Sequence, residues 1–203
     1  MDEASAHDAF LAQDAGAAFA RAVESAEYAV QDAKWKSALS YLDTAEAALA
    51  AWPGTVENHL LVRMYVLRGV VLRHRKEGGA EVAFRQAAAM AWNGEPDARG
   101  IDAEDQFALD AERRKLITSG SGTLMVPGSS TWWLDGVPVE RREISVLAGA
   151  HRLTAVEPGK LRTFSAVVPV LPDRVVTVTP TWGPVDDAAW FLAELSVGVA
   201  TLS

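Results

Sequence analysis

The chain has no cysteine among its 203 residues. Without cysteine it forms no disulfide, no cysteine–zinc site and no thiol nucleophile, and the compartment stays open because such a chain suits either side of a membrane. Proline is absent before Pro53, so the N-terminal part carries no proline that would break a helix. No apolar run is long enough to cross a bilayer as a helix.

Positive charge is also scarce. Lysine and arginine number 19 against 27 acidic residues, which gives a formal net charge of −8 and disfavours binding to nucleic acid or to an anionic membrane surface. Residues 1–10 have neither a basic region nor an apolar core, so no signal peptide is predicted, and an exported protein would need its leader outside this sequence. Apolar residues make up 49%, enough for one large core or two small ones.

Patterns that carry chemistry are missing as well. No two histidines, and no histidine and carboxylate, have zinc-ligand spacing on one helix face. The pair Ser129–Ser130 lacks the glycines of a nucleophile elbow, Asp186–Asp187 fits a helix cap, and no phosphate-binding glycine motif occurs. We therefore expect no catalytic residue, no metal and no cofactor, and we predict that the protein is not an enzyme. The four histidines are His7, His59, His74 and His151.

Residues 9–118 are predicted to be helical, because alanine is abundant and apolar side chains recur at helical spacing. Breaks are expected at 32–34, 52–54, 78–79 and 93–96, and the last three contain glycine or proline. Five helices result, the fifth at 103–117. Trp35, at the start of the second helix, is predicted to be a core residue.

Two helical hairpins in succession predict an α-hairpin repeat. The pattern resembles tetratricopeptide repeats, and this resemblance implies a groove that holds a protein or peptide. Two units are fewer than the roughly three that such repeats usually need, so the β domain, a partner or a second copy must cap the stack. The matching positions are Trp35, Ala38, Leu42, Ala45 and Pro53 in the first unit, and Gly69, Leu72, Gly78, Ala83 and Ala87 in the second.

Residues 122–179 are rich in strand formers. Trp132, Trp133 and Leu134 are followed at once by Asp135–Gly136, which is a strong hairpin signal. Short strands at close spacing predict a small antiparallel sheet or sandwich. Adjacent strand residues face opposite sides, so we expect Trp132 inside and Trp133 outside. An exposed Trp133 is a candidate contact for protein or glycan; the alternative is that it packs on a neighbouring domain or on the loop after the hairpin.

The order of these segments resembles a PEGA domain. The resemblance implies a small extracytoplasmic β-sandwich, often joined to helical repeats and without enzymatic activity, in which His151 sits at a turn and packs. The sequence departs from the family pattern at 137–142, where the family usually has glycine and Thr-Pro. The matching positions are Gly122, Val126, Pro127, Gly128, Leu134, Asp135, Gly136, Gly149, His151, Leu153 and Gly159.

The expected organisation is α+β with two domains. A helical hairpin domain spans 1–119, a small antiparallel β-sandwich spans 120–181, and an apolar tail of helix or strand spans 182–203. Residues 119–122, Ser-Gly-Ser-Gly, are predicted to be a flexible linker. The apolar tail favours membrane attachment through sequence beyond the C-terminus.

The third helix is basic, and Arg63, Arg68 and Arg73 are its candidate binding residues, together with Trp133 on the β-sandwich. Residues 1–57 are strongly acidic. Two interpretations stay open: a solvated face with cations near helix C-termini, or a patch for an acidic peptide or for a second copy of the acidic first hairpin.

These features together predict a non-catalytic protein-binding or scaffold module of the bacterial cell envelope, located in the periplasm. Its helical groove would hold a protein or peptide, and its β domain would act as a spacer or wall-facing module. The alternative is a cytosolic adaptor that self-associates into a homo-oligomer and has no link to the envelope. Nucleic acid is not expected as a partner of either.

Overall fold

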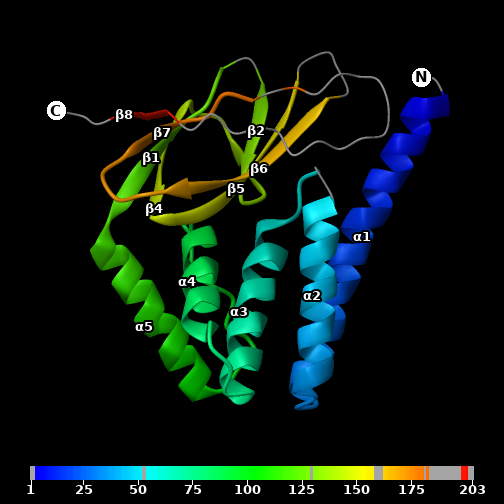
Figure 1. Ribbon diagram of the computed structural model, residues 1–203, viewed down its shortest axis with the longest axis vertical. Helices are drawn as coiled ribbons and strands as arrows, with labels where there is room; N and C mark the ends of the chain where they lie inside the picture. The colour runs from blue at the N-terminus through cyan, green and yellow to red at the C-terminus, as the bar shows by residue number, and fades with distance from the viewer. Residues whose placement is uncertain are drawn as a thin grey trace.

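The computed structural model describes residues 3–51, 54–128, 130–157, 162–180, 182 and 198–200; at 3–15, 51 and 198–200 only the backbone is described. It has an α+β architecture, with a helical part followed by a β part, as the sequence predicts. In Figure 1 the helices stand side by side and the β part lies across one end of them. Two expected turns, at 52–53 and 158–160, fall outside the described residues.

Five helices make the helical part, and their ends follow local chemistry. Asp102 caps the fifth helix, since its side chain accepts a 2.8 Å hydrogen bond from the backbone N–H of Asp105. The chain turns between helices at left-handed residues, including Ala33, Lys76 and Gly79. The helices are α1 (Glu3–Gln31), α2 (Trp35–Ala51), α3 (Asn58–His74), α4 (Ala80–Met90) and α5 (Ala103–Ser119).

The helices pack as the two predicted hairpins, α1 with α2 and α3 with α4, while α3 also contacts α1 and α5. Gly69 permits the close crossing of α3 and α4, because a Cβ there would lie 2.4 Å from the Phe84 ring. Trp35 is not the fully buried core residue that was expected: at the first position of α2 it packs on the edge of the core and is only partly buried, with its indole stacked on the His74 ring at a centroid distance of 4.2 Å. The largest fully buried side chains here are Phe19, Leu42, Leu61, Met64, Leu67, Phe84 and Leu109.

The β part contains two four-stranded sheets, ordered β4-β1-β7-β8 and β3-β2-β5-β6. Its strand pairs are antiparallel, as predicted, except for β1 and β7, which run parallel. Of the tail, only Trp182 and β8 lie within the described residues. The strands are β1 (Ser121–Met125), β2 (Thr131–Leu134), β3 (Val137–Val139), β4 (Glu143–Leu147), β5 (Gly149–Val156), β6 (Thr163–Val170), β7 (Val175–Thr177) and β8 (Gly198–Ala200).

The hairpin of β2 and β3 turns at the predicted dipeptide. Asp135 and Gly136 both have positive φ, 49° and 81°, the signature of a type I′ turn. Trp132 faces the core and is 2% exposed, and its ring meets Phe164 edge-on at 5.9 Å. Trp133 is partly exposed on the other side, so the predicted inside–outside assignment of the two tryptophans is confirmed.

The expected flexible linker between the two parts is wrong. Ser119 ends α5 and Ser121 already begins β1, so only Gly120 separates helix from strand. A Cβ on Gly122 would lie 2.3 Å from the carbonyl oxygen of Leu171, which shows how tightly this strand is packed. The two parts therefore join without a free segment.

The β part is seated directly on the helices. The Asn58 side chain donates hydrogen bonds to the carbonyls of Met90 and Asp135, at 2.9 and 2.8 Å. Arg152 of β5 donates to the carbonyl of Leu49 at 3.1 Å, and a Cβ on Gly136 would lie 1.9 Å from a backbone oxygen of the loop before α3. We infer that this contact is rigid, because buried and partly buried hydrogen bonds span it and the turn leaves no room for a side chain at Gly136.

Candidate functional site

The three candidate arginines of α3 are not gathered into one patch. The Arg63 side chain is 6% exposed and pairs with Glu27 of α1, with 2.6 Å between Nη2 and Oε1. Arg68 pairs with α2, through Asp43 at 3.1 Å. Arg73 pairs with α5, where its Nε lies 2.7 Å from an oxygen of the buried Asp105.

Each arginine therefore joins α3 to a different neighbour. The acidic first hairpin and the basic third helix are complementary, as the sequence indicates, and within this chain they satisfy one another. A role for these arginines in binding a partner stays a prediction.

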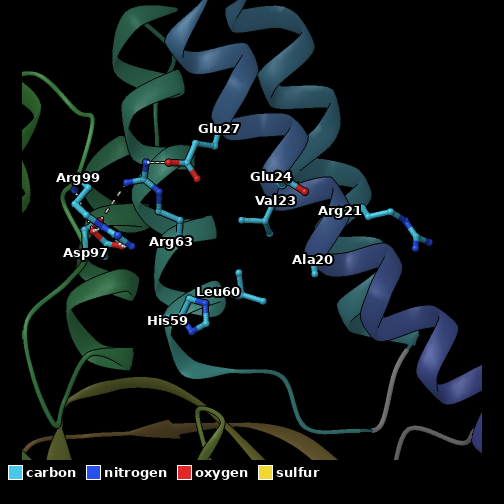
Figure 2. Close-up of a pocket in the computed structure, with 10 residues that line it drawn as sticks. All are labelled: Ala20, Arg21, Val23, Glu24, Glu27, His59, Leu60, Arg63, Asp97 and Arg99. Carbon is cyan, nitrogen blue, oxygen red and sulfur yellow. Dashed lines mark hydrogen bonds and ion pairs between the residues drawn. The ribbon is translucent and has the colours of Figure 1, made fainter.

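A hollow of about 350 Å³ lies between α1, α3 and the segment that follows α4. Figure 2 shows α1 along one side, Leu60 and His59 of α3 at the middle, and Asp97 and Arg99 opposite. Its apolar surface comes mainly from Ala20 and Leu60, since Val23 beneath them is only 1% exposed. The lining residues are Ala20, Arg21, Val23, Glu24, Glu27, His59, Leu60, Arg63, Asp97 and Arg99.

Charge around this hollow is balanced. Three arginines and three carboxylates line it; Arg63 pairs with Glu27, and Arg99 pairs with Asp97. Hydrogen bonds from the Arg99 guanidinium lower the pKa of Asp97 to about 2. Such a hollow suits a segment with both apolar and polar groups better than a small, highly charged ligand.

A second hollow of about 280 Å³ lies beside α5. Glu95, Pro96 and Ala98 line it on one side, and Arg113, Arg114 and other residues of α5 line it on the other. The segment between α4 and α5 therefore separates two neighbouring hollows. The sequence predicted a groove in the helical part but not the residues that line these two hollows, because their walls depend on how α1, α3 and α5 are placed, and residues such as Val23 and Leu60 have the spacing of ordinary core positions.

One group of three side chains in the described part of the chain could hold a metal: His74, Asp102 and Asp105. His74 Nε2 lies 3.1 Å from Asp105 and 3.4 Å from Asp102. The Arg73 guanidinium already pairs with Asp105, and Asp102 already caps α5. Burial raises the pKa of Asp105, while the hydrogen bond from its backbone N–H lowers that of Asp102. These contacts assign the group to joining the end of α3 to the start of α5.

Two residues that carry the PEGA resemblance, Asp135 and His151, contact each other in the core. His151 Nδ1 lies 2.7 Å from Asp135 Oδ2, and His151 Nε2 lies 2.8 Å from the carbonyl oxygen of Leu147. The other carboxylate oxygen accepts from the backbone N–H of Arg152 at 2.7 Å. Both side chains are 0% exposed, so the pair organises the core and a ligand in solvent does not reach it.

This pair holds its protons tightly. Burial lowers the pKa of His151, but the hydrogen bond and charge of Asp135 outweigh it, so the pKa of His151 is raised. The pKa of Asp135 is raised as well, in this case by burial itself. Since the Leu147 carbonyl needs the Nε2 proton, a second proton is shared between Asp135 and Nδ1. Burial lowers the pKa of the neighbouring Arg152 to about 10.

Trp133 is opposite Pro138 on β3 and Thr154 on β5. It lies away from the two hollows of the helical part, on the face of the sheet opposite Trp132. Its proposed contact with protein or glycan stays a prediction.

Comparison with known proteins adds no relative: no family model, no curated protein and no solved structure matches this chain. The resemblances to tetratricopeptide repeats and to PEGA domains therefore stay predictions. None of the helices in the described part of the chain is long and apolar enough to cross a membrane.

Proposed function

We propose that this protein is a non-catalytic binding or scaffold module whose helical part holds a segment of a partner protein between α1 and α3. The observation that carries the proposal is the 350 Å³ hollow with an apolar surface and paired charges at its rim. Three stretches of chain far apart in sequence build it, so it has the form of a groove with walls. A peptide side chain can bury apolar area on the partly exposed Ala20 and Leu60 while its backbone meets the charged rim.

The β part then acts as a rigid spacer. It is held on the ends of the helices by the hydrogen bonds of Asn58 and Arg152. A partner bound to the helices would consequently have a fixed orientation relative to the β part. Location in the bacterial cell envelope remains an expectation from the resemblance to PEGA domains.

The test is a selection of linear peptides from a displayed library on the full chain. Peptides that bind should lose affinity about tenfold or more on an Ala20→Trp variant, because the indole fills the groove. The matched control is Val82→Trp, which adds the same ring on α4 at a position that is 66% exposed. Thermal unfolding confirms that both variants are folded. Peptides that bind both variants equally, or a library that yields none, would refute the groove function.

The alternative of a self-associating adaptor is favoured by a different observation. Phe107 and Ile117 on α5 are 68% and 53% exposed, and the Arg114 guanidinium lies 5.8 Å over the Phe107 ring. Exposed ion pairs contribute little, so apolar surface of this kind would have to carry the association. Sedimentation of the full chain with Phe107→Glu, beside a Val82→Glu control, tests it. A monomer at every concentration removes this alternative.

A further inference from the structure

The connection between α4 and α5 runs the whole length of α3. At its start, the carbonyl of Met90 accepts from Asn58, the first residue of α3. At its end, Asp102 lies 3.4 Å from His74, the last residue of α3. Seventeen helical residues span roughly 25 Å at about 1.5 Å each, and the connection covers that distance with turns near its two ends, where Gly94 N–H donates to Ala91 and Ile101 N–H to Ala98. We call residues 93–101 the strap.

Arginines from two helices hold the strap in the way a groove holds a peptide. Arg63 of α3 donates to the backbone carbonyl of Asp97 at 3.3 Å. Arg113 of α5 donates to the carbonyl of Gly94 at 3.2 Å and to the carboxylate of Glu95 at 2.9 Å. Two of these three hydrogen bonds are accepted by backbone carbonyls, and the third is accepted by a carboxylate. Any extended segment with a carboxylate at the position of Glu95 could therefore make them.

The strap has few buried contacts with the helices beside it. None of residues 93–100 is buried, and the Glu95 side chain is 81% exposed. Ala98 and Ile101 pack against the helical core from partly exposed positions. Gly94 and Gly100 lie near its two ends, and Gly100 has a φ of 70°. Few buried contacts place a segment at the low end of local stability.

The strap lies between the two hollows. One of 350 Å³ separates it from α1, and one of 280 Å³ lies between it and α5. Lifting the strap would join both into one groove. Arg113 would also lose both of the partners that the described residues give it, because Gly94 and Glu95 are on the strap.

We propose that the strap is an internal ligand of the partner groove, and that the partner segment is an extended acidic peptide that displaces it. This inference rests on the proposed function and extends its site, because the partner segment takes the place of the strap, which forms one wall of the hollow between α1 and α3. The partner's carboxylate takes the place of Glu95 on Arg113, and its backbone carbonyls take the place of those at Gly94 and Asp97. The strap reduces the apparent affinity to the intrinsic affinity multiplied by the fraction of time for which the groove is free.

The experiment uses a fluorescent synthetic peptide with the strap's own sequence, residues 91–101, and measures anisotropy on the full chain. A variant with Glu95, Pro96 and Asp97 all replaced by Gly loosens the strap and removes its carboxylates. We expect the peptide to bind this variant at least about tenfold more tightly than the unaltered protein. Adding Arg113→Ala to the variant should remove that gain, and a peptide with Glu95→Lys should not bind it.

The proposal is overturned if the peptide binds neither folded protein, if it binds both equally, or if the lysine peptide binds as well as the acidic one. The result is separable from the proposed function. Library peptides that bind the groove with an affinity indifferent to the strap would overturn the internal ligand and leave the groove function standing. A library that yields no groove peptides would remove the proposed function itself.

Discussion

Replacing Asp135 tests the account of the buried pair most directly. The folded state holds two protons on Asp135 and His151, one on Nε2 for the Leu147 carbonyl and one between the two side chains. In the unfolded chain above about pH 6.5, aspartate is ionised and histidine is neutral, so only one proton remains. Folding therefore takes up one proton in this range.

The stability that this proton contributes is lost as the pH rises. The pKa of His151 is raised on folding, so its contribution to stability is complete below the ordinary value of about 6.5. It is lost as the pH rises from there through the raised value. With one extra proton in the folded state, the free energy of unfolding should fall by about 1.4 kcal/mol per pH unit over that window.

Two substitutions of Asp135 distinguish the stability that its hydrogen bonds contribute from the stability that the shared proton contributes. In Asp135→Asn, the amide N–H₂ can donate to Nδ1 of a neutral His151, and the amide oxygen can still accept from the N–H of Arg152. Asparagine also tolerates the φ of 49°. We expect a cost below about 1.5 kcal/mol near pH 6 and no slope above it. Asp135→Ala leaves both donors unpaired and puts alanine in a left-handed conformation, so we expect a loss of roughly 3–5 kcal/mol.

Denaturant unfolding of the three proteins between about pH 5.5 and 8.5 measures these free energies of unfolding. The difference between the unaltered protein and Asp135→Asn cancels the contributions of the other histidines. If that difference does not change with pH, the shared proton is refuted. If alanine costs no more than asparagine, the hydrogen bonds of the pair do not stabilise the fold.

Two further pairs of variants test the packing in the same unfolding assay. Trp132→Ala should cost about 3–5 kcal/mol, because the ring is 2% exposed, whereas Trp133→Ala should cost less than about 1.5 kcal/mol; equal costs would contradict the register of β2. Gly69→Ala should cost about 1–3 kcal/mol, because its Cβ would lie 2.4 Å from the Phe84 ring. The control Gly78→Ala meets nothing within 4 Å and should be neutral or slightly stabilising; a Gly69→Ala protein as stable as this control would contradict the crossing of α3 and α4.

Local signals in the sequence were strong enough to place most elements. Glycine pairs, the Asn-Gly-Glu-Pro run and helical spacing predicted the helices to within a few residues, and Asp135–Gly136 predicted the hairpin because a type I′ turn needs positive φ at both positions. The parallel pairing of β1 and β7 joins segments about fifty residues apart, as its register of Thr123 with Val175 shows. No short-range pattern encodes such a pairing.

The residues that line the groove escaped prediction for a different reason. Arg63, Arg68 and Arg73 stand out as a basic run, yet α3 is surrounded, and each guanidinium finds a carboxylate on a different helix. The direction of a side chain is set by helix geometry, but its partner is set by the placement of neighbouring helices. The role of Arg113 was missed because its partners lie on the strap, and the sequence pattern indicated only a break between helices there.

The Asp135–Gly136 turn does more than reverse the chain, and this explains why the two parts are joined so closely. Its carboxylate binds the core histidine, its backbone carbonyl accepts from Asn58 at the start of α3, and Gly136 leaves no room for a side chain against the loop before that helix. The first contact fixes the turn within the β part, and the other two fix it on the helices. Because Asn58 also binds Met90, where the connection to the strap begins, the same residue ties the seat of the β part to one end of the proposed groove. Asn58 is therefore a direct link between the turn and the groove, beside the contact of Arg152 with Leu49.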